Sequence, residues 1–247
     1  MFHFKHFSLY HENSALKIST DAVLLAAVTP VDQVRTVLDI GCGCGVIAYC
    51  LAWKMQQKNL RENTCGEKDL QEIIGIDIDA PSISEALKSK AIFPKRSFQN
   101  IHFHQQSIQE FYKDYSENFD LIVSNPPFFV DSLKPNTPQK NISKHNDTLP
   151  FEDLKDAVCQ LLAPNGHFFL ILPANESERF EQITQSQLFK FYQLLIQPNP
   201  TKPINRIITG YQLIPAVKGC ITEHLCLRDN NSSFSEEYRY LTKDMYL

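Results

Sequence analysis

A cluster of glycines indicates a ligand-binding loop. Gly41, Gly43 and Gly45 lie close together, although the whole chain of 247 residues has only eight glycines. Glycine allows the backbone to turn tightly, and it lets a ligand lie against the backbone with no Cβ atom in the way. The spacing of these glycines differs from the dinucleotide-binding pattern G-x-G-x-x-G. The loop is therefore expected to bind a ligand other than a dinucleotide.

Two acidic residues indicate the chemistry of this ligand. Asp39 precedes the first glycine of the loop by two positions, and Asp77 ends the next apolar run. A carboxylate at Asp39 would repel a pyrophosphate but attract an ammonium or sulfonium group. Asp77 can accept hydrogen bonds from both hydroxyls of a ribose. The implied ligand is cationic at one end and nucleoside-like at the other. The alternative interpretation is that Asp39 caps a helix and the glycines only form a turn.

A second set of residues, Asn125-Pro126-Pro127-Phe128, is suited to holding a planar amine. The Asn125 side-chain carbonyl and a backbone carbonyl can accept hydrogen bonds from the amine, and the prolines restrict that backbone. Phe128 or Phe129 can stack on a flipped or unpaired base. This arrangement suits methyl transfer to an amino group by positioning, without a strong general base. The alternative is a simple proline turn after an edge strand.

Strands alternate with helices along the part of the chain that must position these residues. We predict strands at 36–40, 72–77, 100–106, 119–124 and 167–172, helices at 46–56, 81–92 and 151–163, and a turn at 164–166. This alternation indicates a mostly parallel sheet covered on both faces. Ligands of such sheets bind where strands end, so the glycine loop and Asn125 are expected at one crevice. Three further strands, predicted to be antiparallel, lie at 189–197, 206–214 and 221–227.

The chain is expected to form a single domain over residues 1–247. Its parts are a leader with a first helix at 1–35, a cofactor-binding core at 36–175 and a C-terminal helix with strands at 176–247. A long polar loop at 130–150 follows the Asn-Pro-Pro segment, and loops of this length are usually functional or disordered.

The composition excludes several classes of protein. Hydrophobic residues make up 43% and charged residues 21%, so collagen-like, disordered and coiled-coil chains are excluded. The net charge of −4 excludes a strongly basic nucleic-acid-binding protein. Scattered cysteines, with no long apolar run and no signal-peptide pattern, predict a cytoplasmic protein without a membrane span. Cys42 and Cys44 have no matching second pair, so no metal site is expected. The sequence does not determine the oligomeric state, although a monomer is favoured.

With these motifs, the chain resembles the S-adenosylmethionine-dependent methyltransferases of the Rossmann-like class over roughly residues 18–175. The resemblance implies an α/β fold with a seven-stranded, mostly parallel sheet, one antiparallel strand and helices on both faces. It implies that the cofactor S-adenosyl-L-methionine contacts Asp39, Gly41, Cys42, Gly43, Gly45, Asp77, Ile78 and Asn125. Many relatives have an acid after the third strand that binds the adenine amine. Ser107 stands there instead, so adenine recognition is expected from Ser107, backbone groups or packing.

The flanking segments resemble one bacterial family more narrowly. The Asn-Pro-Pro-Phe motif is similar to that of N6-adenine and glutamine-amide methyltransferases, and glutamine-modifying release-factor enzymes usually have a long helical N-terminal domain. The 35 residues before the first predicted strand leave no room for such a domain. Together with Phe129, the leader and the aromatic-rich end at 238–247 resemble the tRNA1(Val) adenine-37-N6 methyltransferase family. This resemblance implies catalytic roles for Asn125 to Phe128 and places Thr20 and Asp21 near the amino-acid part of the cofactor. A plain helix N-cap is the alternative for Thr20 and Asp21.

Two local patches could contact RNA despite the acidic balance. Residues 132–146 contain three lysines and no acid, and residues 202–228 contain four basic residues against Glu223 alone. A few phosphate contacts can dock a folded RNA while a pocket selects the base. The RNA-binding residues we predict are Phe129, Lys134, Lys140 and Lys144. The alternative for each patch is an ordinary solvated surface.

The motifs together predict an enzyme that methylates the exocyclic N6 amine of a tRNA adenine, with tRNA as its partner. Adenine 37 of tRNA1(Val) is implied by the resemblance alone. One alternative keeps the chemistry but methylates a glutamine side chain of a protein on N5. Another is a non-catalytic, cofactor-binding protein that interacts with RNA.

Overall fold

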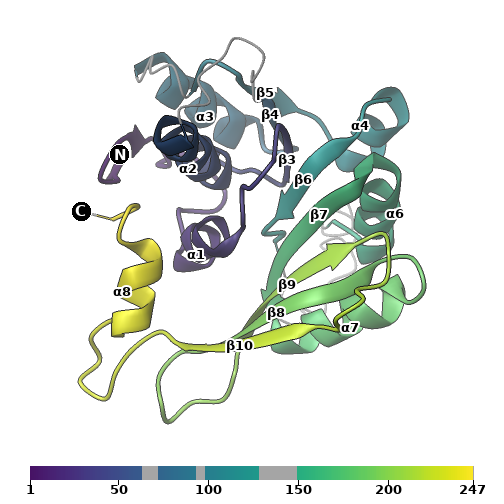
Figure 1. Ribbon diagram of the computed structural model, residues 1–247. Helices are drawn as coiled ribbons and strands as arrows, with labels where there is room; N and C mark the ends of the chain where they lie inside the picture. The colour runs from purple at the N-terminus through teal and green to yellow at the C-terminus, as the bar shows by residue number, and fades with distance from the viewer. Residues whose placement is uncertain (63–71, 93–97, 128–148, 247) are drawn as a thin grey trace, which may run out of the picture.

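The computed structural model describes residues 1–62, 72–92, 98–127 and 149–246, and its centre is a large sheet covered by helices (Figure 1). The eight strands of the sheet are β3 (Thr36–Ile40), β4 (Glu72–Asp77), β5 (Ile101–Gln105), β6 (Phe119–Ser124), β7 (Leu162–Pro173), β8 (Phe189–Gln197), β9 (Arg206–Gln212) and β10 (Ile221–Cys226). Their order across the sheet is β10-β8-β9-β7-β6-β3-β4-β5.

One strand runs against the others, as expected, but the predicted number of strands is wrong. β9 is antiparallel to both of its neighbours, β7 and β8, whereas every other neighbouring pair is parallel. β10 adds an eighth strand to the expected seven and pairs parallel with β8, with Ile221 opposite Tyr192. β10 cannot join β9 because both edges of β9 are occupied. The antiparallel expectation for the C-terminal strands therefore holds for β8 with β9 and fails for β10.

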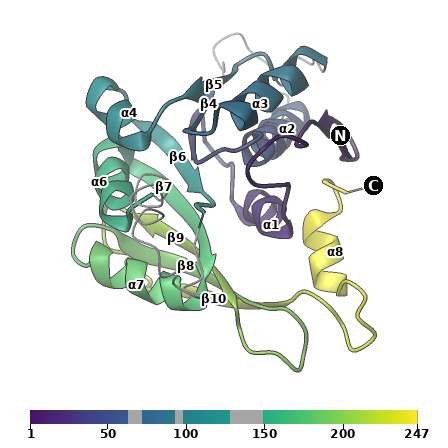
Figure 2. The same ribbon diagram turned by 180° about the vertical axis from the view of Figure 1, so that it is seen from behind.

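Helices cover both faces of the sheet (Figure 2). They are α1 (Thr20–Val28), α2 (Val46–Glu62), α3 (Ala80–Ile92), α4 (Ile108–Asp114), α6 (Phe151–Leu161), α7 (Ala174–Thr184) and α8 (Glu236–Thr242). The core on one face includes residues of α1, α2, α3 and α8, and the core on the other includes residues of α4, α6 and α7. Within β3, Val37 belongs to the first core and Leu38 to the second. Both faces of the strand are buried, which explains its continuous apolar run.

The turn predicted at 164–166 is wrong, because these residues belong to β7. The pairing of β6 with β7 shifts there, since Phe119 is opposite Leu162 but Leu121 is opposite His167. The extra residues of β7 form an irregularity within the strand rather than a turn before it. A Cβ atom at Gly166 would lie 2.8 Å from the backbone oxygen of Phe119, so glycine permits this close approach.

The two ends of the chain pack against each other (Figure 1). The leader forms a small antiparallel pair of strands, β1 (Phe2–His3) and β2 (Ser8–Leu9), which the sequence patterns did not predict. Lys5 donates a backbone hydrogen bond to the carbonyl of Met245, and the rings of Phe4 and Tyr246 stack 6.2 Å apart. The aromatic residues at both ends are therefore part of one packed cluster.

Candidate functional site

The carboxyl ends of three neighbouring strands bring the predicted site residues to one edge of the sheet (Figure 1). Ile40 at the end of β3 is paired with Ile76 of β4 on one side and with Ser124 of β6 on the other. The residues that follow these strand ends are the glycine loop, Asp77 and Asn125. The three segments expected to form the site therefore follow neighbouring strand ends at this edge, where ligands of such sheets bind.

The glycine loop has a backbone that only glycine adopts readily. The φ angles of Gly41, Gly43 and Gly45 are +71°, +55° and +83°, all in the left-handed region. A Cβ atom at Gly41 or Gly43 would have no neighbour within 4 Å, so these residues face open space. A Cβ atom at Gly45 would lie 2.6 Å from the ring of Phe103. Gly41 and Gly43 thus border open space, whereas packing against Phe103 requires glycine at position 45.

Asp77 is oriented by its neighbours at the end of β4. Its Oδ2 accepts a hydrogen bond from Gly43 N (2.8 Å), and its Oδ1 accepts one from Asp79 N (2.8 Å). Burial raises the pKa of the Asp77 carboxyl, and these hydrogen bonds oppose that rise. A carboxylate oxygen can accept more than one hydrogen bond. Asp77 therefore keeps acceptor capacity for further hydrogen bonds, as the predicted contact with ribose hydroxyls requires.

Asp39 lies behind the glycine loop and has no exposed surface. Its Oδ2 accepts a hydrogen bond from Ala48 N (3.1 Å) in the first turn of α2, and its Oδ1 has no hydrogen-bond partner among the described residues. Burial raises the pKa of the Asp39 carboxyl from 3.8 to about 8. A helix-capping role, the alternative weighed from the sequence, describes this contact. Its role toward a cofactor stays a prediction.

The two cysteines of the loop are packing groups. Cys42 and Cys44 are each 3% exposed. Burial raises the pKa of the Cys42 thiol well above its ordinary value and that of Cys44 to about 12, so both thiols are neutral at physiological pH. Among the residues that the structure describes, no group of three or more potential metal ligands occurs.

Ser107 occupies the place where the sequence raised the question of adenine recognition. It is the N-cap of α4, and its hydroxyl oxygen accepts a hydrogen bond from Glu110 N (3.3 Å). The hydroxyl proton remains available for a further hydrogen bond. The next backbone group toward β5, Gln106 N, donates to the carbonyl of Asp77 (3.0 Å). Beside these groups Ile78 is 49% exposed, which offers an apolar surface for a base.

The first turn of α1 differs in detail from the expectation. Ser19 is the N-cap, because its side chain accepts a hydrogen bond from Ala22 N (3.2 Å), so the alternative that assigned the cap to Thr20 and Asp21 is wrong by one residue. Asp21 instead forms an ion pair with Arg206, with Oδ2 2.8 Å from Nε. This pair ties α1 to the first residue of β9.

Asn125 follows β6 directly and is partly buried, with the buried Pro126 after it. The preceding Ser124 donates its hydroxyl to the carbonyl of Ile40 (2.8 Å), which fixes the end of β6 beside the glycine loop. The remaining predicted catalytic and RNA-binding residues lie outside the described part of the chain, and their roles stay predictions. They are Phe128, Phe129, Lys134, Lys140 and Lys144.

Some basic side chains of the second predicted RNA-contacting patch, residues 202–228, are engaged within the protein. Arg206 is held by Asp21, and Arg228 lies 4.4 Å from the centre of the Phe234 ring while donating to a backbone carbonyl. Lys202 and Lys218 are exposed. Two of the four basic side chains therefore already have partners within the protein.

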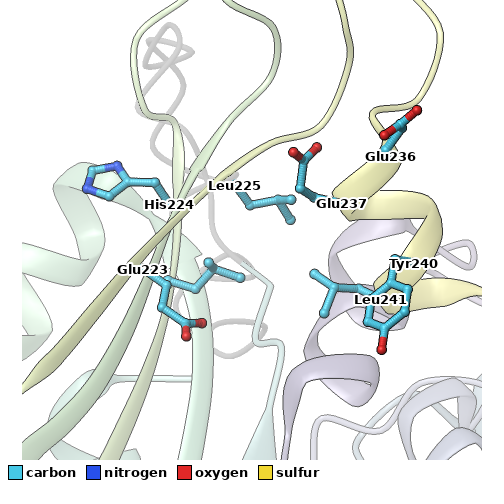
Figure 3. Close-up of a pocket in the computed structure, with 8 residues that line it drawn as sticks. Glu223, His224, Leu225, Glu236, Glu237, Tyr240 and Leu241 are labelled. Atoms are coloured by element: carbon cyan, nitrogen blue, oxygen red, sulfur yellow. The ribbon is translucent and has the colours of Figure 1, made fainter.

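A separate hollow of about 730 Å³ lies between α8 and the sheet (Figure 3). Its lining comes from β8, β10 and α8 and contains none of the predicted site residues. The lining residues are Leu194, Glu223, His224, Leu225, Glu236, Glu237, Tyr240 and Leu241.

Two carboxylates near the crevice were not singled out from the sequence. Asp79 donates its backbone N–H to Asp77, and Glu85 on α3 is buried against the leader. The position of Asp79, two residues after the strand-ending acid, was a usable signal. The sequence carried no such signal for Glu85, because a single acid in a helical segment is usually exposed.

Comparisons with known proteins agree with the fold. A family model described as "Methyltransferase domain" matches residues 32–209. The fold is similar to a predicted O-methyltransferase from Agrobacterium tumefaciens, with a TM-score of 0.65, 16% identity and coverage of 91% of this chain and 96% of that one. It is also similar to the M protein of the type I restriction enzyme EcoKI, with a TM-score of 0.61, 10% identity and coverage of 91% and 53%. No helix in the described part of the chain is long and apolar enough to span a membrane.

Relatives in sequence cover the full chain. A protein from Bacteroides fragilis named "tRNA1(Val) (adenine(37)-N6)-methyltransferase" is 35% identical and is matched over 100% of this chain and 97% of its own length. A protein of the same name from Pseudoalteromonas translucida is 35% identical, with coverage of 100% and 98%. The chain belongs to the tRNA1(Val) (adenine(37)-N6)-methyltransferase family, as the resemblance of its motifs implied.

Proposed function

We propose that this protein transfers a methyl group from S-adenosyl-L-methionine to the exocyclic N6 amine of adenine 37 in tRNA1(Val). The observation that carries the proposal is the position of Asn125. It follows β6 at the carboxyl edge of the sheet, next to the open side of the glycine loop after β3. A target amine held there lies beside a ligand held by the loop. The names of the full-length relatives supply the tRNA and the position.

The residues around the loop fit the cofactor in chemical type. Gly41 and Gly43 leave space for it, and the oriented Asp77 carboxylate suits its ribose. The exposed side chain of Ile78 would pack on its adenine. Thr20 stands at the first turn of α1 and would serve the amino-acid part. When bound, S-adenosyl-L-methionine supplies an electrophilic methyl group on a sulfonium.

Asn125 acts by positioning the acceptor amine. Its side-chain carbonyl and a backbone carbonyl of the Asn-Pro-Pro segment accept the amine N–H groups, so the nitrogen lone pair points away from them. The prolines hold this backbone in one conformation, which prepares the acceptors before substrate binds. Transfer would form a bond between the methyl carbon and the amine nitrogen as the bond between that carbon and the sulfonium sulfur breaks, which would leave S-adenosylhomocysteine. The surplus proton of the nitrogen would then pass to solvent. Asn125 therefore need not gain or lose a proton during the reaction.

The target base must leave its stack to reach this edge of the sheet. Phe128 is proposed to stack on it, and Phe129 with three loop lysines is proposed to contact the RNA around it. The lysines are Lys134, Lys140 and Lys144. Their contacts with phosphates would position the RNA, while the pocket around Asn125 selects the base.

An Asn125→Ala variant tests the proposed mechanism. We expect methylation of tRNA to fall by at least about 100-fold, as for removal of a preorganised polar contact at a reacting group. Binding of S-adenosylhomocysteine should remain within about twofold of the original protein, because Asn125 acts on the acceptor. Asn165→Ala is a matched control, since Asn165 is exposed at the opposite edge of the sheet. Normal turnover in Asn125→Ala would contradict the mechanism.

A further inference from the structure

The leader before α1 is bound to α3 through a buried carboxylate. Glu85 is 2% exposed, and its carboxylate accepts hydrogen bonds from the backbone N–H groups of Asn13 (2.7 Å) and Ser14 (2.9 Å). The Asn13 side-chain amide and the Ser14 hydroxyl donate to the same carboxylate. Burial alone raises the pKa of Glu85, but the hydrogen bonds from Ser14 and Asn13 outweigh it and the pKa is lowered. An ionised, hydrogen-bonded acid therefore holds the leader.

A second contact joins the leader to the predicted ribose-binding acid. Ala15 N donates to Asp79 Oδ2 (3.3 Å), and the same oxygen accepts from Ser82 N (3.0 Å). The backbone of Asp79 donates in turn to Asp77 Oδ1 (2.8 Å). Asp79 thus links the leader to Asp77, the predicted ribose-binding acid, through two successive hydrogen bonds.

The leader loop is also closed on itself. The Lys17 ammonium donates to the backbone carbonyls of His11 (3.0 Å) and Ser14 (3.3 Å), and also to that of Glu12. These bonds close the loop on itself, and those to Glu85 attach it to α3.

Two exposed apolar side chains lie beside this network. Leu16 follows Ala15 and is 56% exposed, and Ile78 precedes Asp79 and is 49% exposed. They are the sequence neighbours of the hydrogen-bonded pair Ala15 and Asp79, so their backbones lie close together. A hydrogen-bonded loop that presents a leucine to solvent beside the predicted ribose-binding acid suits an apolar contact with a base. The two residues that directly follow β5, Gln106 and Ser107, are not acids, and Ser107 caps α4.

We propose that the leader forms the outer wall of the cofactor site, with Leu16 covering the adenosine opposite Ile78. Glu85 and Asp79 are positioning residues that hold the leader in place. The base is then recognised largely by burial of its faces rather than by a carboxylate at its edge. This inference rests on the proposed function only in taking the ligand to be the adenosine of S-adenosylmethionine.

Binding of S-adenosylhomocysteine to the full chain without tRNA, measured by titration calorimetry, tests this inference. Leu16→Ala should weaken binding about tenfold, because apolar contact with the base is lost. Leu87→Ala is the matched control, since Leu87 is 47% exposed on α3, outside the leader contacts, and its affinity should stay within twofold. An affinity of Leu16→Ala within twofold of the original protein would overturn the proposal.

Hydrogen exchange provides a second readout that does not depend on one side chain. In the original protein, S-adenosylhomocysteine should slow exchange of the backbone amides of residues 13–18. Glu85→Gln should speed their exchange without ligand and weaken binding at least threefold, while circular dichroism shows the fold retained. Ligand binding with no added protection of these amides would overturn the proposal.

The outcomes separate this inference from the proposed function. If the original protein methylates tRNA and binds S-adenosylhomocysteine but Leu16→Ala binds normally, only the wall is refuted. If Leu16→Ala binds the ligand normally but loses affinity for tRNA, Leu16 belongs to an RNA surface and the proposal fails. If the original protein does not bind the ligand, the proposed function and the wall fail together.

Discussion

Asp39→Asn should make the cofactor-free protein more stable at neutral pH. Asp39 is fully buried behind the glycine loop, where Oδ2 accepts a hydrogen bond from Ala48 N and Oδ1 has no partner among the described residues. Burial favours the neutral acid, which is why the pKa rises to about 8. Asparagine has nearly the same shape and can still accept the hydrogen bond through its side-chain oxygen, but it cannot ionise.

The size of the effect follows from the difference between the folded and unfolded pKa values. The pKa is raised from 3.8 to about 8, so between these values the folded state binds a proton that the unfolded state has lost. The stability contributed by the raised pKa is complete below pH 3.8 and is lost as the pH rises toward 8. Each pH unit in this window lowers the free energy of unfolding by about 1.4 kcal/mol. From pH 4 to pH 7, the variant should gain about 4 kcal/mol relative to the original protein.

Urea unfolding of both proteins at several pH values from 4 to 8, without cofactor, measures this difference. Other titrating groups are common to the two chains, so their contributions cancel in the comparison. The difference in unfolding free energy should increase steadily with pH and level off near pH 8. A difference that does not change with pH would show that Asp39 is ionised in the folded protein and would refute the reasoning.

Four other changes have expected outcomes. Gly45→Ala should lower the free energy of unfolding by about 2–4 kcal/mol, because it combines a left-handed backbone with a Cβ atom 2.6 Å from the Phe103 ring. In Gly43→Ala the added Cβ atom meets no such neighbour, so the free energy of unfolding should fall by only about 1–2 kcal/mol and the main effect should be weaker S-adenosylhomocysteine binding. Equal losses of stability for the two glycine variants in urea unfolding would contradict this expectation. The lowered pKa of Glu85 contributes stability above pH 4.5, its ordinary pKa, and this stability is lost as the pH falls below that value. Hydrogen exchange of the backbone amides of residues 13–15 should therefore become faster below pH 4.5. Exchange that does not change with pH in this range would argue against an ionised Glu85. Replacing three loop lysines with glutamine should weaken tRNA binding and flatten its salt dependence, whereas unchanged binding at several salt concentrations would reject their role. These are Lys134, Lys140 and Lys144.

The central strands could be predicted because their signals are local. β3, β4 and β6 have the predicted bounds, since each is a short apolar run that stops at a glycine loop, an acid or an Asn-Pro pair. The parallel arrangement also follows from local pattern, because both faces of these strands are apolar. The meeting of the glycine loop, Asp77 and Asn125 at one edge is a geometric consequence of that arrangement.

Features that depend on the whole fold could not be predicted. Whether β10 joins the sheet, and beside which strand, depends on which edges other strands leave free. The inward direction of Asp39 depends on how the loop and α2 pack around it. The ion pair of Asp21 with Arg206 joins residues far apart in the chain, so neither residue signals the other.

The central claim is tested most directly by identifying the methylated product. The protein is incubated with S-adenosylmethionine labelled on its methyl group, together with total tRNA or with total protein, and the products are digested and separated. The account predicts labelled N6-methyladenosine from the tRNA sample, at position 37 of tRNA1(Val). Label on a glutamine of the protein sample, or no label in either sample while the cofactor is bound, would contradict it.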